Sequence, residues 1–271
     1  MTASVCQKIT RPLAAMLLAA CALAMPINAA ELNVYSARKE ALIKPLLDRY
    51  AEQAGLTINL VTGKGDALLT RLKTEGRNSP ADVLITTDAG RLCRAHEAGV
   101  LQAVDSSLLA KAVPAHLRSD NNEWFGLSVR ARAIVYARDR VDPEMLSSYE
   151  ALAEPRWKGR ICIRSSSNIY NQSLVASMLA AHGEKATDEW LHGLVANFAR
   201  PPQGGDRDQI TAVAAGQCDI AVVNSYDYGA MLQTQDAQRT AAGKVAIVWP
   251  IQDGRGPHIL VCGAGGTASA R

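Results

Sequence analysis

Residues 32–62 read LNVYSARKEALIKPLLDRYAEQAGLTINLVT and decide the fold class. The apolar run Leu32–Tyr35 predicts a strand, and apolar residues at helical spacing then predict a helix that continues to about Ala54. Gly55 ends this helix, and a second strand is expected over Thr57–Thr62. Because strands that alternate with helices form mainly parallel sheets covered by helices, this stretch predicts an α/β layer. The residues at helical spacing are Leu46, Leu47, Tyr50 and Ala54.

The same alternation continues beyond this stretch. A third strand is expected over Ala81–Thr87, and the polar stretch Asp105–Trp124 separates this unit from a second series of strands and helices. Two α/β units predict a two-lobed periplasmic binding protein, each lobe a mainly parallel sheet flanked by helices, with the ligand cleft between the lobes. The expected first lobe covers residues 31–124, with 245–271 returning to it, and the second lobe covers residues 125–244.

The N-terminus has the pattern of a secretory signal peptide. Basic residues precede the apolar stretch Leu13–Met25, and small residues follow up to Ala30. Cleavage after Ala30 would remove residues 1–30 and release the protein into the periplasm. The sequence LAAC at residues 18–21 also resembles a lipobox, which would instead anchor the chain to lipid through Cys21.

Composition and charge exclude several classes of protein. Of the 271 residues, 48% are hydrophobic and 20% charged, which is typical of an ordered globular chain. Residues 1–30 hold two of the 29 Lys and Arg and none of the acids, so the remainder carries a formal charge of +1 and has no basic stripe for nucleic acid. No apolar run after residue 30 approaches the ~20 residues of a membrane span.

The sequence also favours a binding protein over an enzyme. It contains no GxSxG, no HExxH, no phosphate-binding loop and no dinucleotide fingerprint, and its five histidines lack ligand spacing. A secreted metal-dependent hydrolase built on Tyr170 and Asp227 is disfavoured, because the base and the histidines that it needs are missing.

Three polar segments are candidates for ligand binding. Asn224–Tyr228 follows an expected strand and opens a helix, which is the sheet edge where α/β proteins bind ligands. Arg164–Tyr170 occupies an equivalent junction, and its backbone N–H groups suit a small anion. Arg130 and Arg132 alternate along a strand, so both guanidiniums are expected on one face as a fork for carboxylate or carbonate. The polar residues of the second segment are Ser165, Ser166, Ser167 and Asn168.

Two cysteines are candidates for a disulfide bond. Cys162 and Cys218 begin two apolar runs that are expected to form neighbouring strands. In an exported protein they would form either a disulfide or two buried thiols.

Taken together, seven motifs make the chain resemble the periplasmic ferric-iron-binding proteins of bacterial ABC transporters, which are bacterial analogues of transferrin. The resemblance extends from Leu32 to Gly265. The motifs are residues 33–38 (NVYSAR), 79–84 (SPADVL), 130–132 (RAR), 157–159 (WKG), 164–172 (RSSSNIYNQ), 224–226 (NSY) and 252–256 (QDGRG).

The resemblance implies a function and a ligand set. Tyr170 and Tyr226 are implied to be phenolate ligands of Fe(III), while Arg130 and the Ser165–Asn168 turn hold carbonate as a synergistic anion. Fe(III) prefers anionic oxygen donors, and its charge can deprotonate a phenol whose pKa is ordinarily about 10. The resemblance further implies a monomer that delivers iron to an ABC permease in the inner membrane.

The sequence departs from the family at two ligand positions and at the C-terminus. Many relatives have a second tyrosine where this chain has Asp227; either this carboxylate or Tyr228 is expected to replace it. Some relatives supply a histidine or tyrosine near Glu40, which is a further candidate donor. Relatives also continue for some tens of residues, so a C-terminally shortened, nonfunctional fragment is one alternative. A binding protein for a small organic or phosphorus-containing anion without metal is another.

Overall fold

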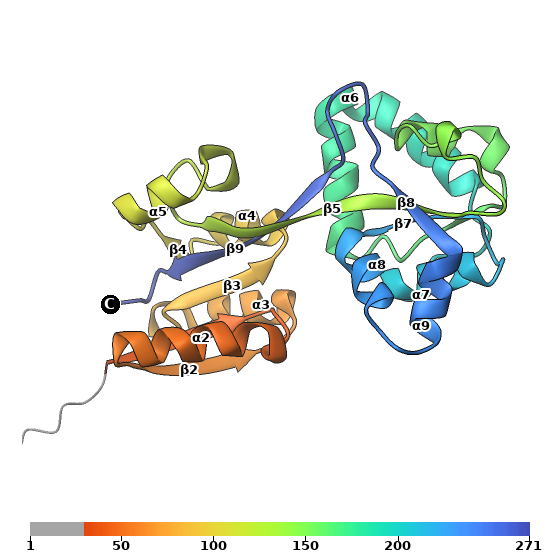
Figure 1. Cartoon of the computed structure of the whole chain (residues 1–271). Coiled ribbons are helices and arrows are strands. Elements are labelled where there is room, and N and C mark those ends of the chain that lie inside the picture. Colours follow the sequence, from red (N-terminus) through yellow and green to blue (C-terminus); the bar gives the residue numbers. More distant parts are fainter. Residues whose placement is uncertain (1–29) are drawn as a thin grey trace, which may run out of the picture.

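The computed structural model describes residues 30–271 as two α/β lobes joined by extended strands (Figure 1). The predicted signal peptide and Cys21 lie outside the described residues. The strands are β1 (Glu31–Ser36), β2 (Thr57–Thr62), β3 (Val83–Thr87), β4 (Leu101–Gln102), β5 (Phe125–Ala137), β6 (Ile161–Cys162), β7 (Ile220–Asn224), β8 (Val245–Val248) and β9 (Ile259–Thr267). The helices are α2 (Glu40–Ala54), α3 (Gly65–Glu75), α4 (Ala89–Glu97), α5 (Ser107–Ala112), α6 (Ile169–Ala196), α7 (Asp206–Ala214), α8 (Ser225–Leu232) and α9 (Ala237–Lys244).

The first lobe begins as the sequence predicts. Strand β1 lies between β2 and β3 and is parallel to both, and β9 then adds an antiparallel strand beside β3. Apolar residues of β1, α3 and β3 pack together in its core, among them Tyr35, Leu72 and Leu84. Burying these side chains provides the main driving force for placing α3 on the sheet.

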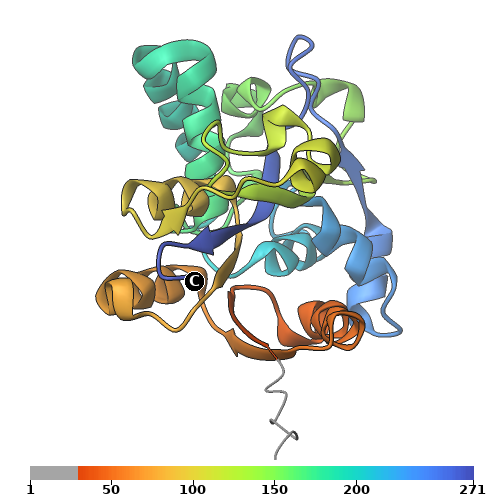
Figure 2. The ribbon, with the colours of Figure 1, turned by 90° about the vertical axis from the view of Figure 1, so that its left-hand side faces the viewer.

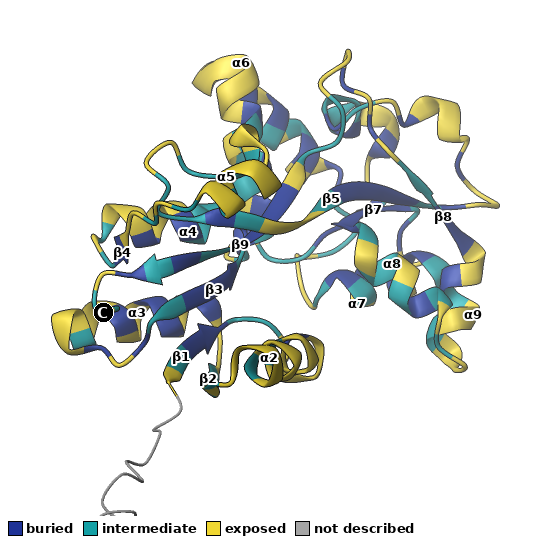
Figure 3. Ribbon diagram, turned by 60° about the vertical axis from the view of Figure 1, so that its left-hand side comes forward, coloured by how far each residue is buried: buried dark blue, intermediate teal, exposed yellow. Residues whose placement is uncertain are grey.

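Helix α2 covers the sheet less completely than its apolar pattern predicts. Ile43 is its only buried residue, whereas Leu46 is 66% and Tyr50 51% exposed. Figure 3 shows the outer surface of α2 as exposed. The helix itself was predicted, but the sheet contacts the side of the helix that carries Ile43 and leaves Leu46 and Tyr50 exposed.

The second lobe is a small mixed sheet enclosed by helices. The second half of β5 pairs with β7 and β8, and β6 pairs with β7 in parallel. Two apolar clusters fill the two sides of this sheet, one around Trp157 and Trp190 and the other around Ile210 and Met231. A disulfide joins Cys162 and Cys218, whose Cα atoms are 5.8 Å apart.

Strand β5 connects the two lobes. Its first half, up to Ala131, pairs with β9 in the sheet of the first lobe, and from Arg132 it pairs with β7 in the second. Figure 1 shows this long strand running out of one lobe into the other beside β9, and in Figure 2 the first lobe faces the viewer. Residues near this change of partner therefore lie where the lobes meet.

Two expectations about the lobes need correction. The two-lobed α/β architecture is confirmed, but the lobes are not mainly parallel, because β9 and β5 are antiparallel to their neighbours. Residues 245–271 do not all return to the first lobe. Strand β8 belongs to the sheet of the second lobe, and only β9 returns to that of the first. A strand's apolar pattern shows that it is buried but does not show which neighbour it pairs with. No helix in residues 30–271 is long and apolar enough to cross a membrane.

Candidate metal and anion site

The predicted iron donors Tyr170 and Tyr226 lie in the first turns of α6 and α8. Asn168 caps α6, since its side-chain oxygen accepts a hydrogen bond from the Tyr170 N–H at 3.0 Å. The strands that precede the two helices, β6 and β7, are parallel neighbours, so their carboxyl ends lie at the same edge of the sheet. Tyr170 is half-buried, and Tyr226 is 46% exposed. The sheet topology thus carries both phenols to one edge.

Arg130 brings the two tyrosines into one site. Its guanidinium carbon lies 4.9 Å from the centre of the Tyr170 ring and 5.9 Å from that of Tyr226. Its Nη1 donates to the sulfur of Cys262, whereas Nε and Nη2 are buried without a hydrogen-bond partner among the described residues. Buried N–H groups are costly when they are unpaired, so this guanidinium is suited to an anion.

The environment of Tyr226 keeps its phenol protonated. Burial, followed by the neighbouring Tyr170 and Asp227, raises the pKa of Tyr226 well above its ordinary value of 10.0, while Arg130 acts in the opposite direction. A phenolate would therefore form here only with a strong positive charge beside it. Binding of a trivalent cation would supply that charge and release a proton.

Asp227 lies beside this site but has a partner. Its carboxylate accepts a hydrogen bond at 3.0 Å from Nε of Arg207, on α7, and its side chain is 13% exposed. Burial raises the pKa of Asp227, and the Arg207 ion pair partly offsets this. To bind a metal, Asp227 would have to share its charge with Arg207.

Within residues 30–271, neither Tyr228 nor Glu40 is hydrogen-bonded to Tyr170 or Tyr226. Tyr228 packs into the core of the second lobe, and its hydroxyl donates to the carbonyl of Val245 at 3.4 Å. Residues two apart on a helix point to nearly opposite sides, which explains why Tyr228 turns away from the site that Tyr226 faces. Glu40 is exposed at the first residue of α2 and has no hydrogen bond or ion pair within residues 30–271.

Arg132 does not form the predicted fork with Arg130. It is fully buried and forms an ion pair with Asp206 at 2.8 Å. Its other donors bond to the side-chain oxygens of Asn224 at 3.1 Å and Asn171 at 2.9 Å. The fork prediction was wrong because β5 changes its partner between residues 131 and 132, so Arg132 enters the second lobe.

Arg132 instead connects the starts of three helices. Asn171 lies in the first turn of α6, Asp206 begins α7, and Asn224 immediately precedes α8. Asp206 also accepts a hydrogen bond from Arg164 at 3.2 Å. This buried network holds the two helix starts that carry the phenols, so Arg132 has a positioning role.

The serine turn satisfies most of its own polar groups. The hydroxyls of Ser165 and Ser167 are 2.9 Å apart, and the N–H of Ser167 donates to the Ser165 hydroxyl at 3.2 Å. Ser166 is exposed, and its carbonyl accepts a hydrogen bond from Gln172. With Asn168 occupied in capping α6, the turn orients Tyr170, while its role in anion binding stays a prediction.

Sequence reasoning passed over two residues that lie near this site. Arg38 lies after β1 and donates from Nη1 to Cys262 at 3.3 Å, the same sulfur that Arg130 contacts. Asp88 is fully buried and caps α4 through the N–H of Gly90 at 2.8 Å. Burial raises the pKa of Asp88, and Arg130 opposes this. Arg38 belongs to the motif at residues 33–38, which was the only signal in the sequence.

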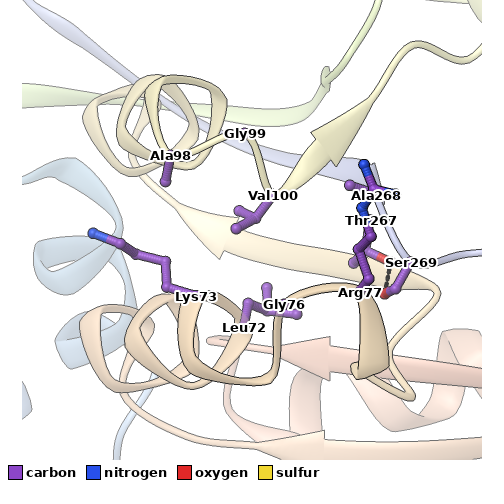
Figure 4. A pocket seen from close by; sticks show the side chains of 10 residues that line it. All are labelled: Leu72, Lys73, Gly76, Arg77, Ala98, Gly99, Val100, Thr267, Ala268 and Ser269. Atoms are coloured by element: carbon purple, nitrogen blue, oxygen red, sulfur yellow. Dashed lines mark hydrogen bonds between the residues drawn. The ribbon is translucent and has the colours of Figure 1, made fainter.

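A groove lies elsewhere, between the end of α3 and the end of β9. It has a volume of about 580 Å³ and opens beside the last residues of the chain (Figure 4). Its lining is Leu72, Lys73, Gly76, Arg77, Ala98, Gly99, Val100, Thr267, Ala268 and Ser269. Within residues 30–271, no group of three or more His, Cys, Asp or Glu side chains is arranged to hold a metal. A metal at the described site would therefore depend on phenol oxygens.

The fold and the tyrosine-bearing edge define a solute-binding protein. The family model described as bacterial extracellular solute-binding protein matches residues 78–255, and the chain belongs to this family. The chain is 50% identical over 236 residues to iron uptake protein A1 of a Synechocystis species, covering 87% of this chain and 66% of that protein. It is 29% identical to the major ferric iron-binding protein of Neisseria gonorrhoeae, over 82% of this chain and 67% of that protein.

Solved structures agree with the sequence relatives. A Trichodesmium FutA structure in complex with iron and citrate ligands matches with a TM-score of 0.85 and 49% identity, covering 89% of this chain and 77% of that one. A Bordetella ferric binding protein matches with a TM-score of 0.80 and 40% identity, covering 89% and 76%. The predicted resemblance to ferric-iron-binding proteins is thus confirmed. The chain spans about two thirds of the length of the curated relatives named above.

Proposed function

We propose that this protein captures Fe(III) between its lobes outside the cytoplasm and delivers it to the permease of an ABC importer in the inner membrane. The observation that carries the proposal is the meeting of Tyr170 and Tyr226 on either side of Arg130. It is supported by relatives whose names refer to iron uptake and ferric-iron binding. A periplasmic monomer is part of the proposal, with a lipid anchor at Cys21 as the alternative.

The donor set suits a small, hard, highly charged ion. Fe(III) favours anionic oxygen, and two phenolates supply two such donors. Their high proton affinity, raised further at Tyr226 by burial, means that iron must displace protons to bind. Loading therefore releases protons and weakens as the pH falls. Asp227 is the proposed third donor, shared with Arg207.

An anion completes the proposed coordination. Arg130 presents two buried nitrogens, Nε and Nη2, without partners among the described residues beside both tyrosine rings. Carbonate is the proposed synergistic anion, held by Arg130 and the serine turn. The citrate in the Trichodesmium complex makes a carboxylate-bearing chelate the alternative source of the same oxygen chemistry.

A second candidate function rests on the same unpaired guanidinium. The site would bind a small organic or phosphorus-containing anion through Arg130, with no metal. On this reading the tyrosines only pack against the guanidinium, as their ring contacts of 4.9 and 5.9 Å allow. The two candidates differ in whether the phenols lose their protons. A binding role without catalysis is proposed in both cases.

Loading the purified protein with Fe(III) in the presence of bicarbonate tests the proposal. We expect a visible phenolate-to-iron charge-transfer band, which Tyr226→Phe removes or strongly weakens, with a loss of iron in competition with a chelator. Tyr228→Phe is the matched control, because that phenol lies two residues away and points into the core. A colourless wild type that takes up no iron would disprove the function, and uptake of anion alone would favour the second candidate.

A further inference from the structure

The first turns of two helices from different lobes pack against each other. Helix α4 belongs to the first lobe and follows Asp88, whereas α6 belongs to the second lobe and begins at Ile169. Gly90 allows the close approach, since a Cβ atom at that position would lie 3.3 Å from Cδ1 of the buried Ile169. A movement of one lobe relative to the other would therefore change this contact.

Asp88 occupies the contact at an energetic cost. Its backbone has a φ of +80°, a value that residues other than glycine rarely adopt. One carboxylate oxygen accepts a hydrogen bond from the N–H of Gly90 at 2.8 Å, whereas the other, Oδ2, is buried without a hydrogen-bond partner among the described residues. Burial raises the pKa of Asp88, and neither the Gly90 N–H nor the charge of Arg130 fully offsets this. A buried carboxylate is costly unless it is fully hydrogen-bonded, so Oδ2 needs a further donor or contact with water.

Ser173 can provide that donor from the other lobe. It lies one turn beyond Ile169 on α6, and its hydroxyl opposes the raised pKa of Asp88, which places it beside that carboxylate. Its Oγ also lies 3.0 Å from Nε2 of His258. A hydroxyl can accept one hydrogen bond and donate another, so this group can connect the imidazole to the carboxylate.

His258 is fixed at the point where the chain passes between the lobes. It immediately precedes β9, its carbonyl accepts a hydrogen bond from the N–H of Arg132 at 2.9 Å, and its own N–H donates to the hydroxyl of Tyr149 at 3.1 Å. Burial lowers the pKa of His258 to about 4, so near neutral pH its ring carries one proton. With this proton on Nε2, His258 donates to Ser173, whose own proton is then free for Asp88.

We propose that His258, Ser173 and Asp88 form a latch between the lobes, in which the Ser173 hydroxyl donates to Oδ2 of Asp88 as the lobes close. The contact of Ser173 with His258 is present in this structure, whereas Oδ2 still has no partner among the described residues. This oxygen is satisfied in two arrangements: bonded to Ser173 with the lobes together, or solvated with the lobes apart. Asp88 thus disfavours intermediate positions of the lobes, and Ser173 stabilises the closed one.

The latch rests on the proposed function only for its biological purpose. Tyr170 lies between Ile169 and Ser173 on α6, so a contact that fixes this turn also positions a proposed iron donor. Closed lobes would retain the ion, and we expect Ser173→Ala to weaken iron retention against a chelator by about three- to tenfold. Ser173 is thus a positioning residue. Its effect on the lobes themselves does not depend on which ligand the protein binds.

Hydrogen–deuterium exchange tests the latch directly. It is measured on the iron-free protein and again after addition of Fe(III) and bicarbonate. We expect Ser173→Ala to speed up exchange in the first turn of α4, in the other lobe, by roughly tenfold, as for the loss of a hydrogen bond to a charged group. Ser177→Ala is the matched control: this serine is half-buried one turn further along α6, and its hydroxyl donates to the carbonyl of Leu174 at 2.7 Å.

A second background tests whether Ser173 acts through Asp88. Asp88→Asn keeps the cap of α4, because its side-chain oxygen can still accept the N–H of Gly90, and asparagine tolerates a positive φ. It removes the buried charge. In this background we expect Ser173→Ala to change exchange in α4 by less than about twofold, since a hydrogen bond between neutral groups is weaker.

Each outcome supports or overturns the latch. Faster exchange in α4 with Ser173→Ala but not with Ser177→Ala supports it. Equal exchange in these two variants and the wild type, with and without Fe(III), overturns it, as does faster exchange confined to α6 or an undiminished effect in the Asp88→Asn background. An unchanged melting temperature of Ser173→Ala excludes a general loss of stability.

The charge-transfer colour is recorded separately, so the latch and the proposed function can fail independently. A colourless wild type whose α4 exchange still depends on Ser173 would retain the latch and reject the function. A coloured wild type with equal exchange in all the variants would do the reverse.

Discussion

Arg130 and Arg132 lie two residues apart on one strand and have opposite environments. Arg130 contacts two tyrosine rings and a thiol and leaves Nε and Nη2 unpaired among the described residues, whereas Arg132 is buried against Asp206 and two asparagines and leaves only Nε unpaired. Their sequence pattern is the same, and only the change in strand pairing between them separates the two roles. A strand that passes between lobes can therefore place one charge for ligand binding and the next for folding.

The largest expected effect is a loss of stability on substituting Arg132, the fully buried arginine of this pair. Arg132→Ala would remove the closer ion-pair partner of the buried Asp206 and leave it only Arg164, and we expect the free energy of unfolding to fall by about 3 kcal/mol, the lower end of the cost of breaking a buried pair. Denaturant unfolding measures this. Arg130→Ala is the control and is expected to change stability by less than about 1 kcal/mol, because it removes no buried carboxylate pair. Similar losses in both variants would contradict the distinction.

A pH dependence tests the same buried network through His258. Its ring nitrogen lies 3.0 Å from the hydroxyl of Ser173, and burial, with a smaller contribution from Arg132, lowers the pKa of His258 from 6.5 to about 4. As the pH falls below 6.5, the unfolded chain binds a proton that the folded ring does not. The free energy of unfolding should thus decrease between pH 6.5 and about 4 and not further from this group.

The lowered pKa of His258 sets the size of the expected change in the free energy of unfolding. We expect a loss of about 3 kcal/mol by pH 4, since one pKa unit corresponds to about 1.4 kcal/mol. Unfolding of wild type and His258→Gln is compared at neutral pH and at pH values down to about 4. The difference between the two proteins isolates this group from the carboxylates that also titrate. Parallel pH profiles would show that His258 is not responsible.

Substituting Arg130, the arginine beside the two phenols, is expected to affect ligand binding instead of the fold. Arg130→Ala removes the guanidinium beside both phenols, and we expect iron affinity in bicarbonate to fall by roughly tenfold or more, as for a lost charged hydrogen bond. The remaining iron binding should no longer respond to added bicarbonate. Chelator competition with and without bicarbonate measures both. An unaltered bicarbonate response would assign the anion to the serine turn alone.

The smallest expected effect concerns Asp227. Because its carboxylate is already paired with Arg207, we expect Asp227→Asn to weaken iron binding by only about threefold, comparable to the loss of a weak ion pair. Asp227→Tyr should strengthen binding and deepen the colour by adding a phenolate. Chelator competition and the visible spectrum measure these changes. Equal affinity in wild type, Asp227→Asn and Asp227→Ala would remove Asp227 from the ligand set.

Local patterns predicted much of the fold and part of the site. Alternating strands and helices with glycine stops identified the two α/β lobes, and a strand followed by a helix start placed Tyr170 and Tyr226 at ligand-binding edges. The pairing of Cys162 and Cys218 was one of two alternatives, and the structure joins them. These features depend on residues close in sequence or on simple rules for sheet edges.

The sequence by itself thus determined the class of fold, the family resemblance and the two phenols as candidates, because each follows from short-range periodicity or from contiguous motifs. Only the tertiary structure decided which arginine lies beside the two phenols. Arg38 and Arg130 are distant along the chain, and β9 brings their guanidiniums to one sulfur. Arg132 lies buried because β5 exchanges β9 for β7 at that residue. Strand pairing between distant segments depends on the packing of the whole sheet, and that information is not contained in the alternation of a single strand.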